Sequence, residues 1–148
     1  MSIETEPRRI LSAEDVTNLI DAAFPGIHKH GRQIHIESVA DRSARLRLTP
    51  GESSIRPGGT ISGPAMFTLA DMAIYVALIG TLGASAIAAV TSNLNINFLL
   101  RPDVADVVAD ARIMRLGRRL AYADVQLTSA GRPELIAHAT GTYALPRA

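Results

Sequence analysis

The sequence has no cysteine, and this absence excludes several kinds of site. Without a thiol, the chain forms no disulfide, carries no cysteine nucleophile and offers no cysteine ligand to a metal. Its histidines and acids do not have the spacing of a known metal motif, so we expect neither a metal nor a cofactor. The glycines lack the spacing of dinucleotide and phosphate loops, and no Gly-x-Ser-x-Gly elbow of a serine hydrolase occurs.

Lysine is almost absent as well. Lys29 is the sole lysine, and the other lysine-or-arginine positions are all arginine. The formal net charge of +1 gives no reason to expect a nucleic-acid partner. Guanidinium groups suit phosphate and carboxylate better than an ammonium group does, because they can bind both oxygens at once. Clusters of arginine are therefore the places where the sequence predicts an anionic ligand.

The chain also lacks a long apolar leader. Residues 1–9 are polar and have no apolar signal-peptide core, so we expect a cytoplasmic protein. The most apolar stretch runs from Pro64 to Val90, but Asp71 and two glycines interrupt it and leave it too short to span a bilayer. We interpret it as a core helix followed by a turn, and we expect no membrane partner.

A length of 148 residues indicates one domain, 1–148, with enough core to fold without disulfides. Ser12 and Asp15 form a capping-box pattern, which predicts a first helix that ends at Pro25. Alternating apolar residues predict two short strands, over 34–39 and 44–48.

A second helix is predicted from Pro64 to about Ile79, and its residues are apolar nearly all round. Such a helix should be buried on every side. Alternating patterns then predict four more strands, which short turns would make antiparallel neighbours. Strands segregated from helices indicate an α+β fold in which an antiparallel sheet wraps one long central helix. The four later strands are expected over about 90–98, 104–116, 121–128 and 135–145.

Asp71 is the only charged residue in the long helix. An ionised carboxylate in an apolar helix is costly unless it is paired or reaches a wet cleft. Carboxylates in such surroundings are common at active sites. Two readings stay open at this point: Asp71 pairs with an arginine at an interface, or it works in an active site.

Gly63 stands eight residues before Asp71, at the start of the same helix. Free N–H groups at a helix N-terminus point outward, and the helix dipole there favours negative charge. This spacing predicts an oxyanion donor and an acid within reach of one small ligand. The alternative is that Gly63 only permits a tight turn into the helix. Tyr75, one turn after Asp71, is a candidate to line the same cleft.

Four segments together resemble the PaaI-like hotdog thioesterases, a branch related to 4-hydroxybenzoyl-CoA thioesterase. The likeness covers most of the chain after residue 40 and implies the hotdog fold. Its strongest part is the run from glycine through Leu-Ala-Asp in the long helix. The segments are Gly59-Thr-Ile-Ser-Gly-Pro-Ala-Met-Phe-Thr-Leu-Ala-Asp-Met-Ala73, Asn95-Ile-Asn-Phe-Leu-Leu-Arg-Pro102, Gly117-Arg-Arg119 and Gly141-Thr-Tyr-Ala-Leu145.

The resemblance implies roles for individual residues. Gly63 matches the glycine whose N–H polarises the thioester carbonyl, and Asp71 matches the carboxylate that activates water or attacks the thioester carbon. Ser62 stands where the family often has histidine and keeps a hydroxyl that can hydrogen-bond. Pro64 replaces a second glycine and lacks an N–H. Ser54 corresponds loosely to an upstream asparagine of the family.

Three arginines at strand ends, Arg101, Arg118 and Arg119, are candidates to hold the phosphates of coenzyme A. The resemblance makes 117–119 the strongest candidate, and the alternative is a solvated, charged turn. The resemblance also implies an acyl-CoA substrate and paired subunits, as a homodimer or homotetramer. A lone subunit would leave edge strands and apolar helix surface exposed.

The leading interpretation is therefore hydrolysis of an acyl-CoA to a free acid and coenzyme A, with carrier-protein thioesters as an open alternative. A hydratase or dehydratase of enoyl thioesters is a second reading, but such enzymes usually need a histidine where Ser62 stands. A third reading is a non-catalytic domain that binds acyl-CoA for regulation. The first helix has no basic stripe, so nothing indicates DNA binding.

Overall fold

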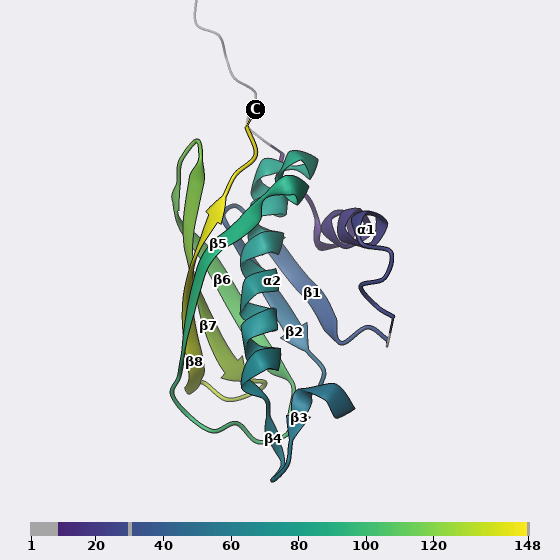
Figure 1. Ribbon diagram of the computed structural model, residues 1–148, viewed down its shortest axis with the longest axis vertical. Helices are drawn as coiled ribbons and strands as arrows, with labels where there is room; N and C mark the ends of the chain where they lie inside the picture. Colours follow the sequence, from purple (N-terminus) through teal and green to yellow (C-terminus); the bar gives the residue numbers. More distant parts are fainter. Residues whose placement is uncertain (1–8, 30, 148) are drawn as a thin grey trace, which may run out of the picture.

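A computed structural model describes residues 9–29 and 31–147 (Figure 1). The polar segment on which the expected location rests lies outside these residues, apart from Arg9. Within these residues, two helices, two short 3-10 helices and eight strands follow one another. Their bounds are α1 Ala13–Ala23, β1 Ile34–Ala40, β2 Ser43–Leu48, η1 Glu52–Ser54, β3 Ile55–Arg56, β4 Thr60–Ile61, α2 Gly63–Leu82, η2 Ala84–Ala88, β5 Val90–Phe98, β6 Val107–Leu116, β7 Leu120–Ser129 and β8 Leu135–Ala144.

Six of the strands form one antiparallel sheet in the order β1-β2-β6-β7-β8-β5, and β3 pairs with β4 in a separate hairpin. The sheet curves behind α2, and α1 lies beside β1 (Figure 1). The β3–β4 hairpin lies beyond the N-terminal end of α2. An antiparallel sheet around one long helix is the hotdog fold, so the predicted fold class is confirmed.

The expected neighbours of β5 were wrong in one respect. Strand β5 pairs with β8 and not with β6, which follows it in the chain. Residues 99–106 connect β5 to β6, and this connection is longer than a tight hairpin loop, so it leaves the two strands free to separate. As a result, β5 forms one edge of the sheet and β1 forms the other.

Helix α2 extends further than the sequence predicted. It begins at Gly63 and continues through Gly80 to Leu82, where Gly83 with φ of 90° ends it. Gly80 lies inside the helix, and its carbonyl accepts a 3.0 Å hydrogen bond from Leu11 N. Any side chain at Gly80 would run into Val39. The glycine therefore serves close packing and not helix termination.

Helix α2 is also not buried on every side. Its C-terminal half, Ala73–Thr81, is buried under the sheet, α1 and η2. In its N-terminal half the side chains of Phe67 and Thr68 are exposed, and Asp71 is half-buried. The helix has the length and hydropathy of a membrane span, but 67% of that window is buried within the fold. Its apolar character thus matches a core helix with one open side.

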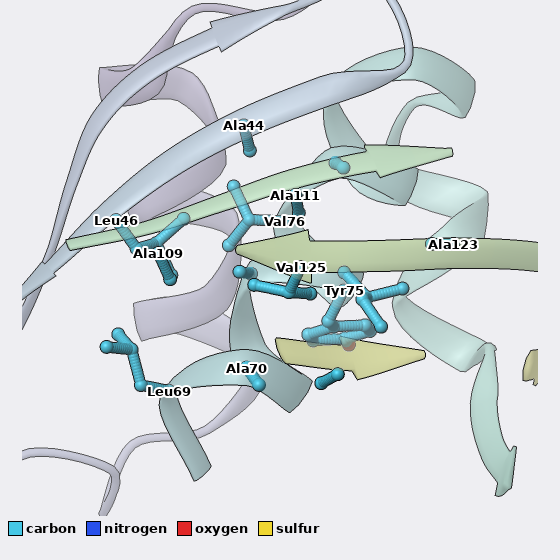
Figure 2. Close-up of a cluster of buried hydrophobic side chains, with 14 of the residues drawn as sticks. Ala44, Leu46, Leu69, Ala70, Tyr75, Val76, Ala109, Ala111, Ala123 and Val125 are labelled. Carbon is cyan, nitrogen blue, oxygen red and sulfur yellow. The ribbon is translucent and has the colours of Figure 1, made fainter. Parts of the chain in front are cut away.

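Small side chains let α2 lie close to the sheet (Figure 2). Leu69, Ala70 and Val76 face strands on which many of the inward positions are alanine. A fully buried leucine or valine contributes roughly 1.5–3 kcal/mol to the free energy of unfolding, so this interface is the main source of stability. The buried alanines of the sheet are Ala44, Ala109, Ala111, Ala121, Ala123, Ala137 and Ala139.

Candidate active site

Asp71 is held by two hydroxyl groups from the sheet. Thr91 Oγ1 on β5 donates to Asp71 Oδ1 at 2.8 Å, and the Tyr143 hydroxyl on β8 donates to the same oxygen at 2.6 Å. The Tyr143 hydroxyl also lies 3.0 Å from the backbone carbonyl of Asp71. Within the described residues, the second carboxylate oxygen has no hydrogen-bond partner and no arginine pairs with Asp71. One oxygen is thus anchored while the other is open.

Tyr143 can only act as a donor to this carboxylate. Its side chain is 3% exposed, and this burial, together with the hydrogen bond to Asp71, raises the pKa of the Tyr143 phenol far above its ordinary value. The phenol therefore stays protonated. Hydrogen bonds to a charged group contribute about 1.5–3 kcal/mol, so the contact fixes the orientation of the carboxylate.

Tyr75 contacts Tyr143 and does not bond to the carboxylate of Asp71. Its ring stacks on Tyr143 with centroids 6.2 Å apart, and its hydroxyl donates to the carbonyl of Ile87 at 2.6 Å. Burial raises the pKa of the Tyr75 phenol as well. The structure thus brings Tyr75 close to Tyr143, where it supports the donor, and gives its hydroxyl a partner in the fold.

The sequence analysis named neither Tyr143 nor Thr91 as part of this site, and Thr91 is the harder of the two to predict. Strict alternation along β5 places it on the face opposite to Leu94, away from the helix. A β-bulge between Thr91 and Asn93 changes this, since Thr91 pairs with Tyr143 while Leu94 pairs with Gly141. The extra residue turns Thr91 toward α2. Nothing in the polar pattern of this strand indicates the bulge.

The N-terminus of α2 is built by the residues predicted around Gly63. Ser62 is the N-cap, and its Oγ accepts from Ala65 N at 3.2 Å. The Ser62 N–H donates to the carbonyl of Ser54 at 2.8 Å. The Ser54 hydroxyl is engaged with Gly51, both as donor at 2.9 Å and as acceptor at 2.8 Å. Both serines therefore hold the backbone that presents Gly63.

The N–H of Gly63 is the group left open at this helix end. It lies in the first turn, where helical N–H groups have no acceptor inside the helix, and no described residue accepts from it. The ring of Phe98 lies against Gly63, because an added Cβ would come within 3.2 Å of Phe98 Cζ. Gly63 thus combines an open donor with the absence of a side chain.

One expectation about this pair was wrong for a single chain. Gly63 and Asp71 are eight residues apart on a regular helix, which separates them by about 12 Å along its axis at 1.5 Å per residue. A reacting carbonyl must lie about 3 Å from both the donor and the acid. One subunit therefore does not bring the donor and the acid to one thioester.

A pocket of about 600 Å³ opens beside Gly63. We name it the loop pocket because residues 26–29 and 31–33, between α1 and β1, form one wall. Ser62, Pro64 and Ala65 border one part of it, and Thr68 and Met72 continue the same wall along α2. Its apolar lining from the sheet and α1 comprises Ile20, Ile34, Ile36, Leu46 and Leu48.

A second cleft, of about 990 Å³, lies at the other end of α2. We name it the arginine cleft because Arg42, Arg118, Arg119 and Arg147 line it together with a single acid, Asp41. None of these arginines forms an ion pair with an acid within the described part of the chain.

The structure therefore brings Arg118 and Arg119 together, and it adds Arg42 and Arg147, which the sequence analysis did not consider. Arg101 lies elsewhere, because its Nη2 donates to the Gly58 carbonyl at 3.1 Å in the β3–β4 turn. The loops that join β1 to β2 and β6 to β7 meet only in the folded chain, so spacing along the chain carries no signal for this cluster.

Comparison with protein families shows the family to which this chain belongs. Residues 58–136, more than half of the chain, match the family model described as the thioesterase superfamily. The chain belongs to the thioesterase superfamily. The matched segment contains Ser62, Gly63, Asp71, Thr91 and both Arg118 and Arg119. Family membership assigns thioester hydrolysis as the general class of activity.

Individual relatives agree with this membership. A protein described as “putative thioesterase” from Silicibacter sp. TM1040 is 31% identical, has a TM-score of 0.81, and matches over 98% of this chain and 99% of that one. “Putative esterase Ta0293” from Thermoplasma acidophilum is 27% identical over 115 residues, which are 78% of this chain and 85% of the relative.

The likeness to PaaI proteins is also present at the level of the fold. A variant of the phenylacetic acid degradation protein PaaI from Thermus thermophilus has a TM-score of 0.68 at 23% identity, over 85% of this chain and 100% of that one. Within the described residues, this thioesterase-superfamily protein has no group of three or more acids and histidines placed to hold a metal ion.

The two buried phenols give a pH prediction for this site. Since the fold raises the pKa of Tyr75 and Tyr143, the folded state holds these protons more tightly than the unfolded chain does. Their contribution to stability is complete below about pH 10 and is lost as the pH rises above that value.

In a Tyr122→Phe background these are the only phenols of the chain, so we expect the absorbance at 295 nm to stay flat until alkaline unfolding begins. Circular dichroism recorded in parallel reports unfolding. An ionisation near pH 10 in a fully folded sample would contradict the burial of both groups.

Proposed function

We propose that this protein hydrolyses acyl-CoA thioesters at a site formed between two copies of the chain. The observation that carries the proposal is the pair of open groups on α2: the Gly63 N–H and the unpaired oxygen of Asp71. Each has the chemistry of one half of a hydrolytic site, and they lie about 12 Å apart along the helix axis, at 1.5 Å per residue. A second copy can supply the missing half at each end.

The free edge of the sheet supports pairing with a second copy. Strand β5 is an edge strand of nine residues without a single charged side chain, whereas unpaired edges in monomers are usually protected by charge, proline or a covering element. Large apolar side chains are exposed on this strand and beside it, and exposed apolar side chains at a sheet edge favour association. They are Phe67, Val90, Phe98, Leu99 and Leu100.

A two-fold pairing of β5 with its counterpart would be antiparallel, since symmetric neighbours run in opposite directions. Such pairing brings the Phe98 end of one strand next to the Thr91 end of the other. Gly63 lies under Phe98, and Thr91 holds Asp71, so each Gly63 comes to lie near the partner's Asp71. The same contact covers the open side of α2.

At this composite site the two groups divide the reaction. The Gly63 N–H, aided by the helix dipole, stabilises the negative charge on the thioester oxygen. The open oxygen of the partner's Asp71 takes a proton from water, the resulting hydroxide attacks the thioester carbon, and the carboxyl group then returns the proton to the departing thiolate. Direct attack by the carboxylate, with hydrolysis of the anhydride that forms, stays open as a second route.

The arginine cleft is proposed to hold the phosphates of coenzyme A. It lies at the C-terminal end of α2, about 16 Å along the axis from Asp71 at 1.5 Å per residue, and the pantetheine arm can span such a distance. Guanidinium groups bind phosphate through two parallel hydrogen bonds. Four arginines against one acid make this the strongest concentration of positive charge at either cleft.

A hydratase is not favoured, because no histidine among the described residues bonds to Asp71. A non-catalytic acyl-CoA-binding domain is the alternative that the same experiment tests. Ser62 supports that alternative, because it caps the helix and offers no imidazole.

The role of the carboxylate as a base is tested by Asp71→Asn. The amide oxygen can still accept from Thr91 and Tyr143, so the fold should persist while the base is lost. Release of thiol from a panel of acyl-CoAs should fall about 10²–10⁴-fold, the usual contribution of a positioned base.

Asp110→Asn is the matched control, because Asp110 pairs with Arg45 on the surface of the sheet and should retain full activity. Binding of acyl-CoA without thiol release by the wild type would contradict hydrolysis and support the binding domain.

The role of the arginine cleft in phosphate binding is tested by a double variant. Arg118→Gln with Arg119→Gln should raise KM for an acyl-CoA about tenfold or more, as expected for the loss of charge-assisted hydrogen bonds. The same acyl group on pantetheine lacks the nucleotide phosphates, so the preference for CoA over pantetheine should fall. Arg112→Gln, an exposed change on β6 outside the cleft, is the control. An unchanged preference in the double variant would place the phosphates elsewhere.

A further inference from the structure

The loop pocket begins next to the proposed oxyanion donor. Ser62, Pro64 and Ala65 border both the pocket and Gly63. A thioester whose carbonyl accepts from the Gly63 N–H therefore has this hollow directly beside its acyl group. Along α2 the pocket continues from Ala65 to Met72, about 10 Å at 1.5 Å per residue. This length along α2 suits a medium-length acyl chain.

The loop pocket has an apolar part, formed by β1 and β2, and a charged part, formed by α1 and the loop. The floor consists of isoleucine and leucine from β1 and β2, which suits a hydrocarbon chain. Asp21 of α1 and His28, Lys29 and Arg32 of the loop also line it, and Asp21 bonds to His28 and Arg32. A pocket that serves only a hydrocarbon tail has no need of this charged wall.

The acid in this wall is already occupied. Arg32 Nη2 donates to Asp21 Oδ2 at 2.7 Å, and His28 Nε2 lies 3.0 Å from Asp21 Oδ1. The hydrogen bond from Arg32 is the main reason that the pKa of Asp21 lies below its ordinary value, so the carboxylate is ionised. Asp21, Lys29 and Arg32 together carry a formal charge of +1. The wall therefore offers N–H donors and surplus positive charge.

We propose that the loop pocket binds the acyl group and that its cationic wall selects acyl chains that end in a second carboxylate. This inference rests on the proposed acyl-CoA hydrolysis and deepens it by naming the substrate class. The distal carboxylate accepts hydrogen bonds from Lys29 and Arg32, while the intervening methylene groups lie on Ile34, Leu46 and Leu48. A chain that ends in a methyl group gains no hydrogen bond from Lys29 or Arg32, so the chain with a terminal carboxylate is favoured.

Matched pairs of substrates test the selection. Hexanoyl-CoA and adipoyl-CoA have the same chain length and differ only at the far end, as do octanoyl-CoA and suberoyl-CoA. We expect wild-type kcat/KM to favour the dicarboxylic member of at least one pair by about tenfold or more, the effect of one charge-assisted hydrogen bond. Lys29→Glu and Arg32→Gln should each lower that ratio, and Lys29→Glu should reverse it. Arg112→Gln lies outside the pocket and should keep the wild-type ratio.

The outcomes separate this inference from the function on which it rests. If the monocarboxylic members are hydrolysed as well as or better than the dicarboxylic ones, the selection is wrong while hydrolysis stands. A wild-type preference that Lys29→Glu and Arg32→Gln leave unchanged overturns the role of the wall. If folded protein releases thiol from no member of either pair, the proposed hydrolysis fails and the selection fails with it.

Discussion

The hydrogen bonds from Tyr143 and Thr91 to one oxygen of Asp71 connect the chemistry of this protein to its fold. A carboxylate inside an apolar helix is stable only with donors or water around it. Here the donors come from β8 and β5, and the bulge in β5 turns Thr91 toward α2. Both donors bond to the same oxygen of Asp71. Burial keeps Tyr143 protonated, and Tyr75 stacks behind it. Because these contacts use only one oxygen, the other stays available to a water molecule or a thioester.

The second constraint is the length of α2. Gly63 and Asp71 lie too far apart to act on one carbonyl, yet β5 presents an uncharged edge that a second copy can extend. In the proposed pair, the thioester lies between Gly63 of one subunit and the partner's Asp71. The acyl group then enters the loop pocket of the first subunit, and coenzyme A extends toward the arginine cleft of the second. In this proposal the loop pocket and the arginine cleft, which lie toward opposite ends of α2, each hold one part of the substrate.

The sequence predicted the helices and strands better than it predicted which strands pair in the sheet. The capping box at Ser12, the alternating strands and the Leu-Ala-Asp helix gave the fold class, because local patterns determine these features. The pairing of β5 with β8 and the bulge that turns Thr91 inward depend on tertiary contacts, and local patterns do not record them. For the same reason Arg42 and Arg147 were missed, since two loops and the segment that follows β8 meet at Arg118 only in the folded chain. The continuation of α2 through Gly80 likewise follows from its packing against Val39.

The most direct test of a site shared between two copies is complementation between inactive variants. Asp71→Asn removes the acid, and Gly63→Val places a side chain against Phe98, where the thioester is proposed to lie. The two chains are co-expressed with different tags, and the heterodimer is isolated by two affinity steps before thiol release from an acyl-CoA is measured. A shared site predicts one intact site in each heterodimer, and thus about half of wild-type activity in a symmetric dimer. Activity no higher than that of either parent would show that each chain works alone and would contradict the composite site.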